Sequence, residues 1–127
     1  MATRPTFTSG DVFTAVNANI LATSIVALNT QAGTAYTAAL TDVGKLISFT
    51  SGTAIAFTIP ANATVAFAVG DQINIYQAGT ATATITPAAT VTVRSSGSKL
   101  KTNDQFSVAT CIKIDTNEWI ALGNLKA

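Results

Sequence analysis

Alternation of apolar and polar residues, interrupted by frequent turn signals, is the feature that most restricts the fold of this chain. From about residue 35 onward, apolar residues recur at every second position, as in residues 54–59 and 106–114. Turn pairs such as Ser51-Gly52 and Gly70-Asp71 separate these runs. Short runs of period two between turn residues predict an all-β domain, either an antiparallel sandwich or a barrel-like fold.

The clearest local prediction is a C-terminal hairpin, in which residues 106–114 and 118–122 flank the turn Asp115-Thr116-Asn117. The first strand of this hairpin has an apolar face (Phe106, Val108, Thr110, Ile112 and Ile114) and a second face of Ser107, Ala109, Cys111 and Lys113. Combined with the other runs, the pattern predicts a set of residues buried within one subunit or between subunits. These are Phe49, Phe57, Ile59, Phe67, Ile73, Ile75, Phe106, Val108, Ile112 and Trp119.

Residues 1–30 have a different pattern from the rest. Thr14 is an acceptable N-cap, and Val16, Ile20 and Leu21 share one side of a short helix. The neighbouring asparagines are weak helix formers, so we expect this helix to need a partner surface for stability.

The chain is therefore predicted to divide into an N-terminal docking arm with a short helix, residues 1–30, and a β-domain, residues 31–127. Packing of the helix on its own domain is the alternative. The predicted partner-binding residues are the apolar anchors of the arm: Phe7, Val12, Phe13, Val16, Ile20 and Leu21.

Charge is scarce in this chain. Apolar residues make up 48% of the sequence and charged residues only 10%, well below the roughly 25% of a typical soluble domain. Such a surface suits a protein buried in an assembly or an oligomer, although part of the excess of small apolar groups simply fills strands. The nearest approach to a basic cluster, Arg94, Lys99 and Lys101, surrounds a serine-rich turn and gives no electrostatic footprint for nucleic acid.

The residue census offers little for catalysis. The chain has no histidine, which excludes serine and cysteine triads based on histidine and histidine metal sites. Its six carboxylates show no spacing that favours a catalytic pair or a calcium loop. We therefore expect no enzyme activity, no catalytic residue, no metal and no cofactor. The single cysteine, Cys111, is expected to be a buried small hydrophobe.

No targeting or membrane segment is predicted. The first residues are polar and lack the apolar core of a signal peptide. The fairly apolar residues 20–28 are too few to span a bilayer. The sequence thus predicts synthesis in a cytoplasm and no membrane contact.

Two stretches resemble patterns of tailed-bacteriophage structural proteins. Residues 40–46, LTDVGKL, resemble the opening of a β-module of such proteins, and its later landmarks follow in order. These landmarks are TIP at 58–60, VGDQI at 69–73, QAG at 77–79, SKLK at 98–101, QFSVAT at 105–110 and WIALGNL at 119–125. Residues 7–19, FTSGDVFTAVNAN, are similar to a pattern near the start of tail, fibre and head-associated proteins, with Phe13 where a leucine is commoner.

The resemblance implies a virion protein made in the bacterial host cytoplasm. Its leading interpretation is a capsid decoration (cement) protein, a homotrimer that binds the major capsid protein or other virion proteins and stabilises the shell. A fibre or baseplate adhesin that contacts a host surface glycan or protein is the alternative, and a lytic or depolymerase enzyme is disfavoured by the residue census. In a trimer, the small side chains of the Thr/Ala strands would let sheets approach closely around the axis.

Overall fold

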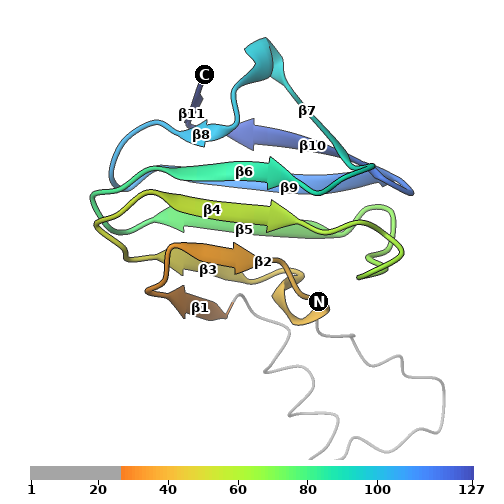
Figure 1. Cartoon of the computed structure of the whole chain (residues 1–127), viewed down its shortest axis with the longest axis horizontal. Helices are drawn as coiled ribbons and strands as arrows, with labels where there is room; N and C mark the ends of the chain where they lie inside the picture. The colour runs from red at the N-terminus through yellow and green to blue at the C-terminus, as the bar shows by residue number, and fades with distance from the viewer. Residues whose placement is uncertain (1–26) are drawn as a thin grey trace, which may run out of the picture.

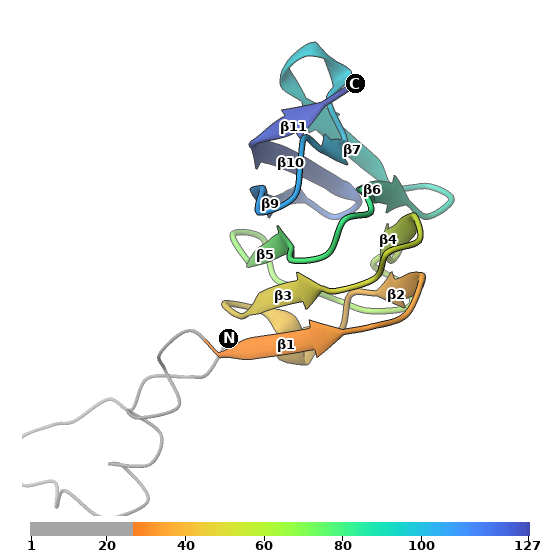
Figure 2. The same cartoon turned by 90° about the vertical axis from the view of Figure 1, so that its left-hand side faces the viewer.

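The computed structural model describes residues 27–127, which form β-strands in two sheets packed face to face (Figures 1 and 2). The predicted all-β sandwich is therefore confirmed. The six-stranded sheet contains, in spatial order, β1 (Leu28–Gln31), β3 (Leu46–Phe49), β5 (Gln72–Gln77), β9 (Val108–Asp115), β10 (Glu118–Gly123) and β7 (Thr92–Ser95). The five-stranded sheet contains β11 (Leu125–Lys126), β8 (Lys101–Thr102), β6 (Ala83–Pro87), β4 (Ile55–Ile59) and β2 (Ala35–Thr37). Two short 3-10 turns, η1 (Leu40–Asp42) and η2 (Ser96–Ser98), complete the described elements.

The strand directions differ from the antiparallel arrangement expected from the sequence. Successive strands from β1 to β9 lie in alternate sheets, so β1–β2, β3–β4 and β5–β6 each make one coil of the chain around the core. Because each sheet receives every second strand, β1, β3 and β5 run parallel, as do β2, β4 and β6. Of the nine strand pairings in residues 27–127, five are parallel and four are antiparallel.

The turn at Ser51-Gly52 shows the consequence of this arrangement. The strands on its two sides, β3 and β4, lie in opposite sheets and do not pair with each other. The next turn along the axis, at Ala78-Gly79, stacks directly on it, and the Gly79 amide donates to the Phe49 carbonyl at 2.9 Å. A Cβ on Gly79 would lie 2.4 Å from the Ser51 carbonyl oxygen. Only glycine lets the two backbones approach this closely.

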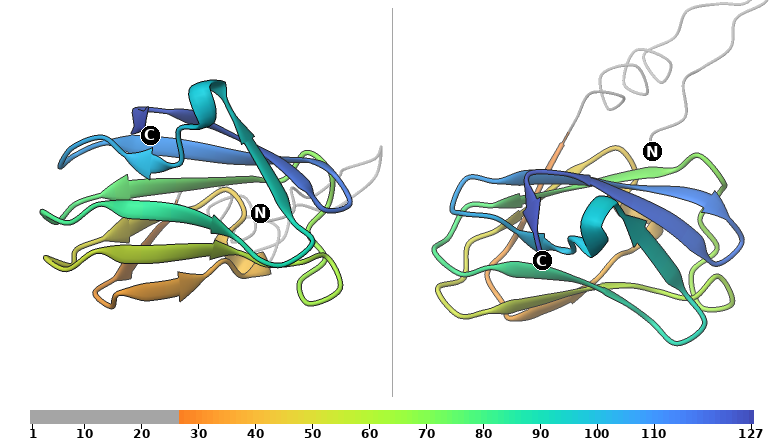
Figure 3. Two further views of the ribbon diagram at one scale, coloured as in Figure 1. Left: turned by 45° about the horizontal axis from the view of Figure 1, so that its top comes forward. Right: turned by 90° about the horizontal axis from the view of Figure 1, so that it is seen from above.

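The core lies between the two sheets and is rich in isoleucine and phenylalanine. Of the residues predicted to be buried, most belong to it: Phe49, Phe57, Ile59, Phe67, Ile73, Ile75 and Trp119. Trp119 meets Phe67 edge to face, with their ring centroids 5.3 Å apart, a favoured aromatic geometry. Near this pair, β7 runs obliquely beside β10 across one end of the sandwich (Figure 3).

A buried polar network closes the opposite end of the core, beside the first coil. The Asp42 carboxylate is 1% exposed and accepts hydrogen bonds from the Tyr36 hydroxyl at 2.6 Å, the Asn29 amide at 2.7 Å and the Ala39 backbone amide at 2.8 Å. Gln31 donates to Asn29 at 2.9 Å. Burial together with the hydrogen bond to Asp42 raises the pKa of Tyr36 to about 12. The network therefore satisfies polar groups that would otherwise be costly to bury.

The boundary expected after residue 30 falls inside β1, since Leu28–Gln31 form the edge strand of the six-stranded sheet. The predicted short helix lies outside the described residues. Among residues 27–127, no helix has the length and apolar character needed to cross a membrane.

Candidate interaction surface

The six predicted anchors of the N-terminal arm, Phe7, Val12, Phe13, Val16, Ile20 and Leu21, lie outside the described residues. The described residues show an unexpected feature in β9. Hydrophobicity predicts that its more apolar face points into the core, but that face points outward. Ala109, Cys111 and Lys113 point into the core and are at most 2% exposed. Val108 and Ile114, by contrast, are 45% and 40% exposed.

The neighbours of β9 explain this orientation. In the six-stranded sheet, Ala109 pairs with Ile75, and Cys111 pairs with Ile73 on one side and Ala121 on the other. Small inward residues fit between large neighbours such as Ile73, Ile75 and Trp119 at native packing density. The face of β9 with larger side chains is consequently left outside the core.

The inward Lys113 is held by specific partners. Its ammonium group donates to the Asn62 side-chain oxygen at 2.6 Å and to the Phe67 carbonyl at 2.7 Å. The Asn62 backbone amide in turn donates to Asn117, in the hairpin turn, at 2.9 Å. Burying this lysine therefore ties the loop before β5 to the C-terminal hairpin.

The outward orientation of the more apolar face of β9 also means that three residues of the predicted core are not in it. Phe106 is 67% exposed and Val108 is 45% exposed, while Ile112 is half-buried on the outer face. Burial of these three side chains within one subunit was the wrong expectation, and only burial between subunits is left for them. Phe106 also has a positive φ of 73°, which is uncommon for a bulky residue and stores backbone strain.

Alternation along the strands places an apolar group on the outer face of every strand of the six-stranded sheet except β7. We call this surface the outer apolar face. Its members are Leu28, Leu46, Tyr76, Val108, Ile112, Ile114, Ile120 and Leu122. Leu28 and Leu122 are 64% and 50% exposed.

Several of the polar side chains on the outer apolar face are already paired. Thr110 donates to the Asn74 side-chain oxygen at 2.8 Å, and Gln72 donates to the same oxygen at 3.0 Å. At the β7 and β10 side, Arg94 forms an ion pair with Glu118. If this face were covered, its apolar groups would be buried and these five side chains would keep the partners that they already have.

The outer face of the five-stranded sheet has a different composition. Its outward side chains are small or polar: Ala35, Thr37, Ala56, Thr58, Thr84, Thr86, Lys101 and Lys126. Register aligns Thr37 with Thr58 and Thr58 with Thr86. This surface of threonines, alanines and lysines is compatible with exposure to water.

The chemistry of the described residues is sparse. Burial raises the pKa of the Cys111 thiol to about 12, which keeps it protonated and unreactive at neutral pH. No group of three or more histidine, cysteine, aspartate or glutamate side chains that could hold a metal ion occurs within residues 27–127.

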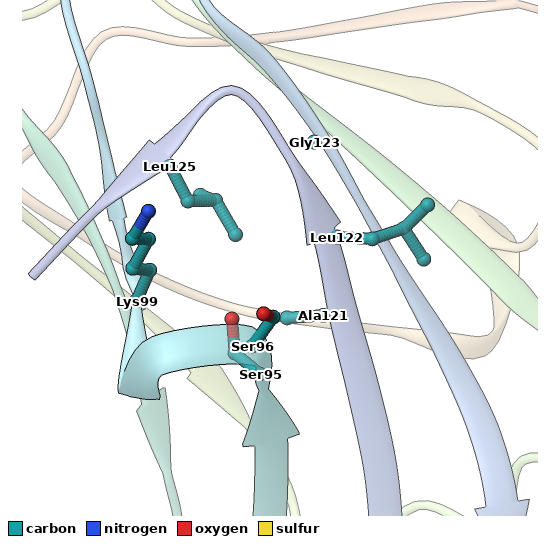
Figure 4. Close-up of a pocket in the computed structure, with 7 residues that line it drawn as sticks. All are labelled: Ser95, Ser96, Lys99, Ala121, Leu122, Gly123 and Leu125. Atoms are coloured by element: carbon teal, nitrogen blue, oxygen red, sulfur yellow. The ribbon is translucent and has the colours of Figure 1, made fainter.

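A pocket of about 190 Å³ lies between η2 and the end of β10 (Figure 4). Its lining residues are Ser95, Ser96, Lys99, Ala121, Leu122, Gly123 and Leu125. Figure 4 shows Leu125 and the two serines on one side of β10 and the Leu122 side chain pointing to the other. The pocket is smaller than the roughly 300–1,000 Å³ of typical small-molecule sites.

Sequence reasoning missed the outer apolar face because alternation shows which residues share a face and not which face is turned inward. Comparison of the chain with family models, with curated proteins and with solved structures found no match.

Proposed function

We propose that this protein is a non-catalytic structural component of a tailed-phage particle, a decoration protein that binds the capsid shell and stabilises it. The main support for a structural role is the outer apolar face. Exposed apolar patches of several hundred Å² on a folded domain mark interaction sites. A chain with 10% charged residues and such a face is suited to an assembly.

The phage context of the proposal rests on the sequence resemblance, and the landmarks of that resemblance have structural roles. Asp42 centres the polar network beside the first coil. Gly70 has a positive φ of 94° in the turn before β5. Gln77 accepts a hydrogen bond from Thr102 and so links the two sheets. These positions are ones that a reused β-module would need to keep, which supports the resemblance.

In the proposed mechanism, the part of the chain before β1 docks on the major capsid protein or another virion protein, and the β-domain projects from the shell as part of a homotrimer. Binding across neighbouring capsomers adds to the resistance of the shell against internal DNA pressure. A closed three-fold contact suits the three-fold positions of an icosahedral lattice.

The location and copy number of the protein in purified virions test this proposal. Quantitative gels and imaging should find hundreds of copies on the head. A few to dozens of copies at the tail would contradict it and favour the adhesin.

A binding assay on particles that lack the protein tests the arm. The full chain should bind, and a Phe7→Ala/Phe13→Ala variant should bind at least 30-fold more weakly, since losing aromatic anchors costs more than about 2 kcal/mol. A Val69→Ala variant, which changes an exposed side chain of the β-domain, serves as the control. Equal binding of all three proteins would place the docking surface on the β-domain.

A further inference from the structure

We infer that the outer apolar face packs against the same face of further copies of this chain. The inference deepens the proposed function, on whose homotrimer it rests, by assigning the surface that holds the copies together. The Thr/Ala strands of the five-stranded sheet were the sequence-based expectation for this contact. The structure favours the opposite sheet, because that is where the large apolar side chains lie exposed.

The lack of unpaired charge on the outer apolar face favours a second copy of this chain as its binding partner. The outward groups of the six-stranded sheet include one cation and one anion, Arg94 and Glu118, and these pair with each other at one edge. The centre of the face has no charge that would select an acidic or basic partner. A neutral apolar surface is complementary to itself, so further copies meet its requirements without any change in either partner.

The area of the face supports the same occupant. The six strands contain 32 residues in all. At a rise of about 3.3 Å per residue and a strand spacing of about 4.8 Å, they give a face of roughly 500 Å². Two such faces in full contact would bury roughly 1,000 Å², which is about the smallest area expected of a biological interface. Exposed Phe106, two residues before β9, adds to the apolar surface at one end of β9.

The position of β1 makes this contact compatible with a separate docking arm. The chain enters the β-domain at β1, which is the edge strand of the six-stranded sheet. A contact that covers the face therefore leaves the entry point of the chain at the rim of the interface. One surface then joins the copies, and the proposed arm is left for the particle.

Light scattering on the full chain at micromolar concentration tests the inference. The wild-type protein should have about three times the 13.0 kDa mass of one chain. An Ile114→Lys/Leu122→Lys variant places two cations on the outer apolar face of each copy and should fall to 13.0 kDa. Both positions are at least 40% exposed, so circular dichroism should show an intact β-fold.

The matched control is a Thr58→Lys/Thr86→Lys variant, which puts the same charge on the outer face of the five-stranded sheet and should keep the wild-type mass. Should the first variant fail to fold, the nearly isosteric Val108→Thr change keeps a β-favouring residue and should weaken self-association at least threefold.

A monomeric wild-type protein would overturn the inference, as would a trimer that only the control variant dissociates. The proposed function is tested separately by the virion count. A trimer held by this face but absent from virions would refute the decoration role alone. A virion protein that is monomeric in solution would refute the interface and the homotrimer, and would leave the decoration role in place.

Discussion

Two regions of the molecule differ in where alternation sends their larger apolar side chains. We call them the coil region, β1–β6 (residues 28–87), and the hairpin region, β9–β10 (residues 108–123). In the coil region, Phe57 and Ile85 point inward, while Thr58 and Thr86 point outward. In β9 of the hairpin region, the larger apolar side chains point outward and the core receives alanine, cysteine and lysine.

The residues compared in the coil region belong to the five-stranded sheet, and β9 belongs to the six-stranded sheet. The two sheets therefore differ in how many of their faces are apolar. The five-stranded sheet has one apolar face, as expected for a sheet with one side in water. The six-stranded sheet has apolar groups on both faces, a pattern typical of sheets covered on both sides. The molecule therefore has a second surface suited to burial, which the fold of a single chain does not cover.

The largest expected effects come from the core, where both regions should respond alike. Phe57→Ala in the coil region and Trp119→Ala in the hairpin region should each lower the free energy of unfolding by about 3–5 kcal/mol, because both rings are fully buried. Denaturant unfolding measures the change. An unchanged melting temperature for Trp119→Ala together with loss of binding to a partner would remove Trp119 from the core and make it an adhesive site.

A second prediction tests the stacking of turns, which is specific to the coil region. Gly79→Ala should cost about 2–3 kcal/mol, because the added methyl would lie 2.4 Å from a backbone oxygen that cannot move aside. Gly52→Ala, in the turn on which Gly79 stacks, is the control. Its nearest neighbour would be a threonine hydroxyl at 3.6 Å, so stability should change little. Equal effects of the two substitutions would show that the turns do not stack.

A third prediction concerns the inward polar face of β9. Lys113→Met should lower the free energy of unfolding by about 1–2 kcal/mol, because the Asn62 and Phe67 oxygens lose their charged donor. The exposed Lys126→Met provides the control and should be nearly neutral. If Lys113→Met instead stabilises the protein, the cost of burying the amine exceeds the value of its hydrogen bonds.

The smallest effect is confined to alkaline solution and to the first coil. The pKa of Tyr36 is about 12 in the folded state, whereas in the unfolded chain it has the ordinary tyrosine value of 10.0. Between these values the unfolded state binds fewer protons, so stability is complete below pH 10 and falls as the pH rises toward 12. Tyr36→Phe should make this decline shallower in pH-dependent denaturant melts. An identical slope would mean that the hydroxyl is not buried with Asp42.

The sequence predicts the strands of this fold better than their pairing. Alternation placed β4, β9 and β10 at nearly the observed positions, and the turn predicted between β9 and β10 was correct. The order of strands in each sheet was not predictable, since Ser51-Gly52 suits either a hairpin or a crossing between sheets. The orientation of β9 depends on the volume left by Ile73, Ile75 and Trp119, which is a tertiary property.

Because successive strands lie in alternate sheets, the order in which the chain can fold is also restricted. In the coil region no strand pairs with its neighbour in sequence. Strand β1 can pair only once β3 is present, and β3 gains its second partner only once β5 is present. The β9–β10 pair, by contrast, closes over a tight turn and can form within microseconds. We expect slow folding dominated by the non-local pairs. A chain emerging from the ribosome would then gain most of its native sheet only after its C-terminal half has been synthesised.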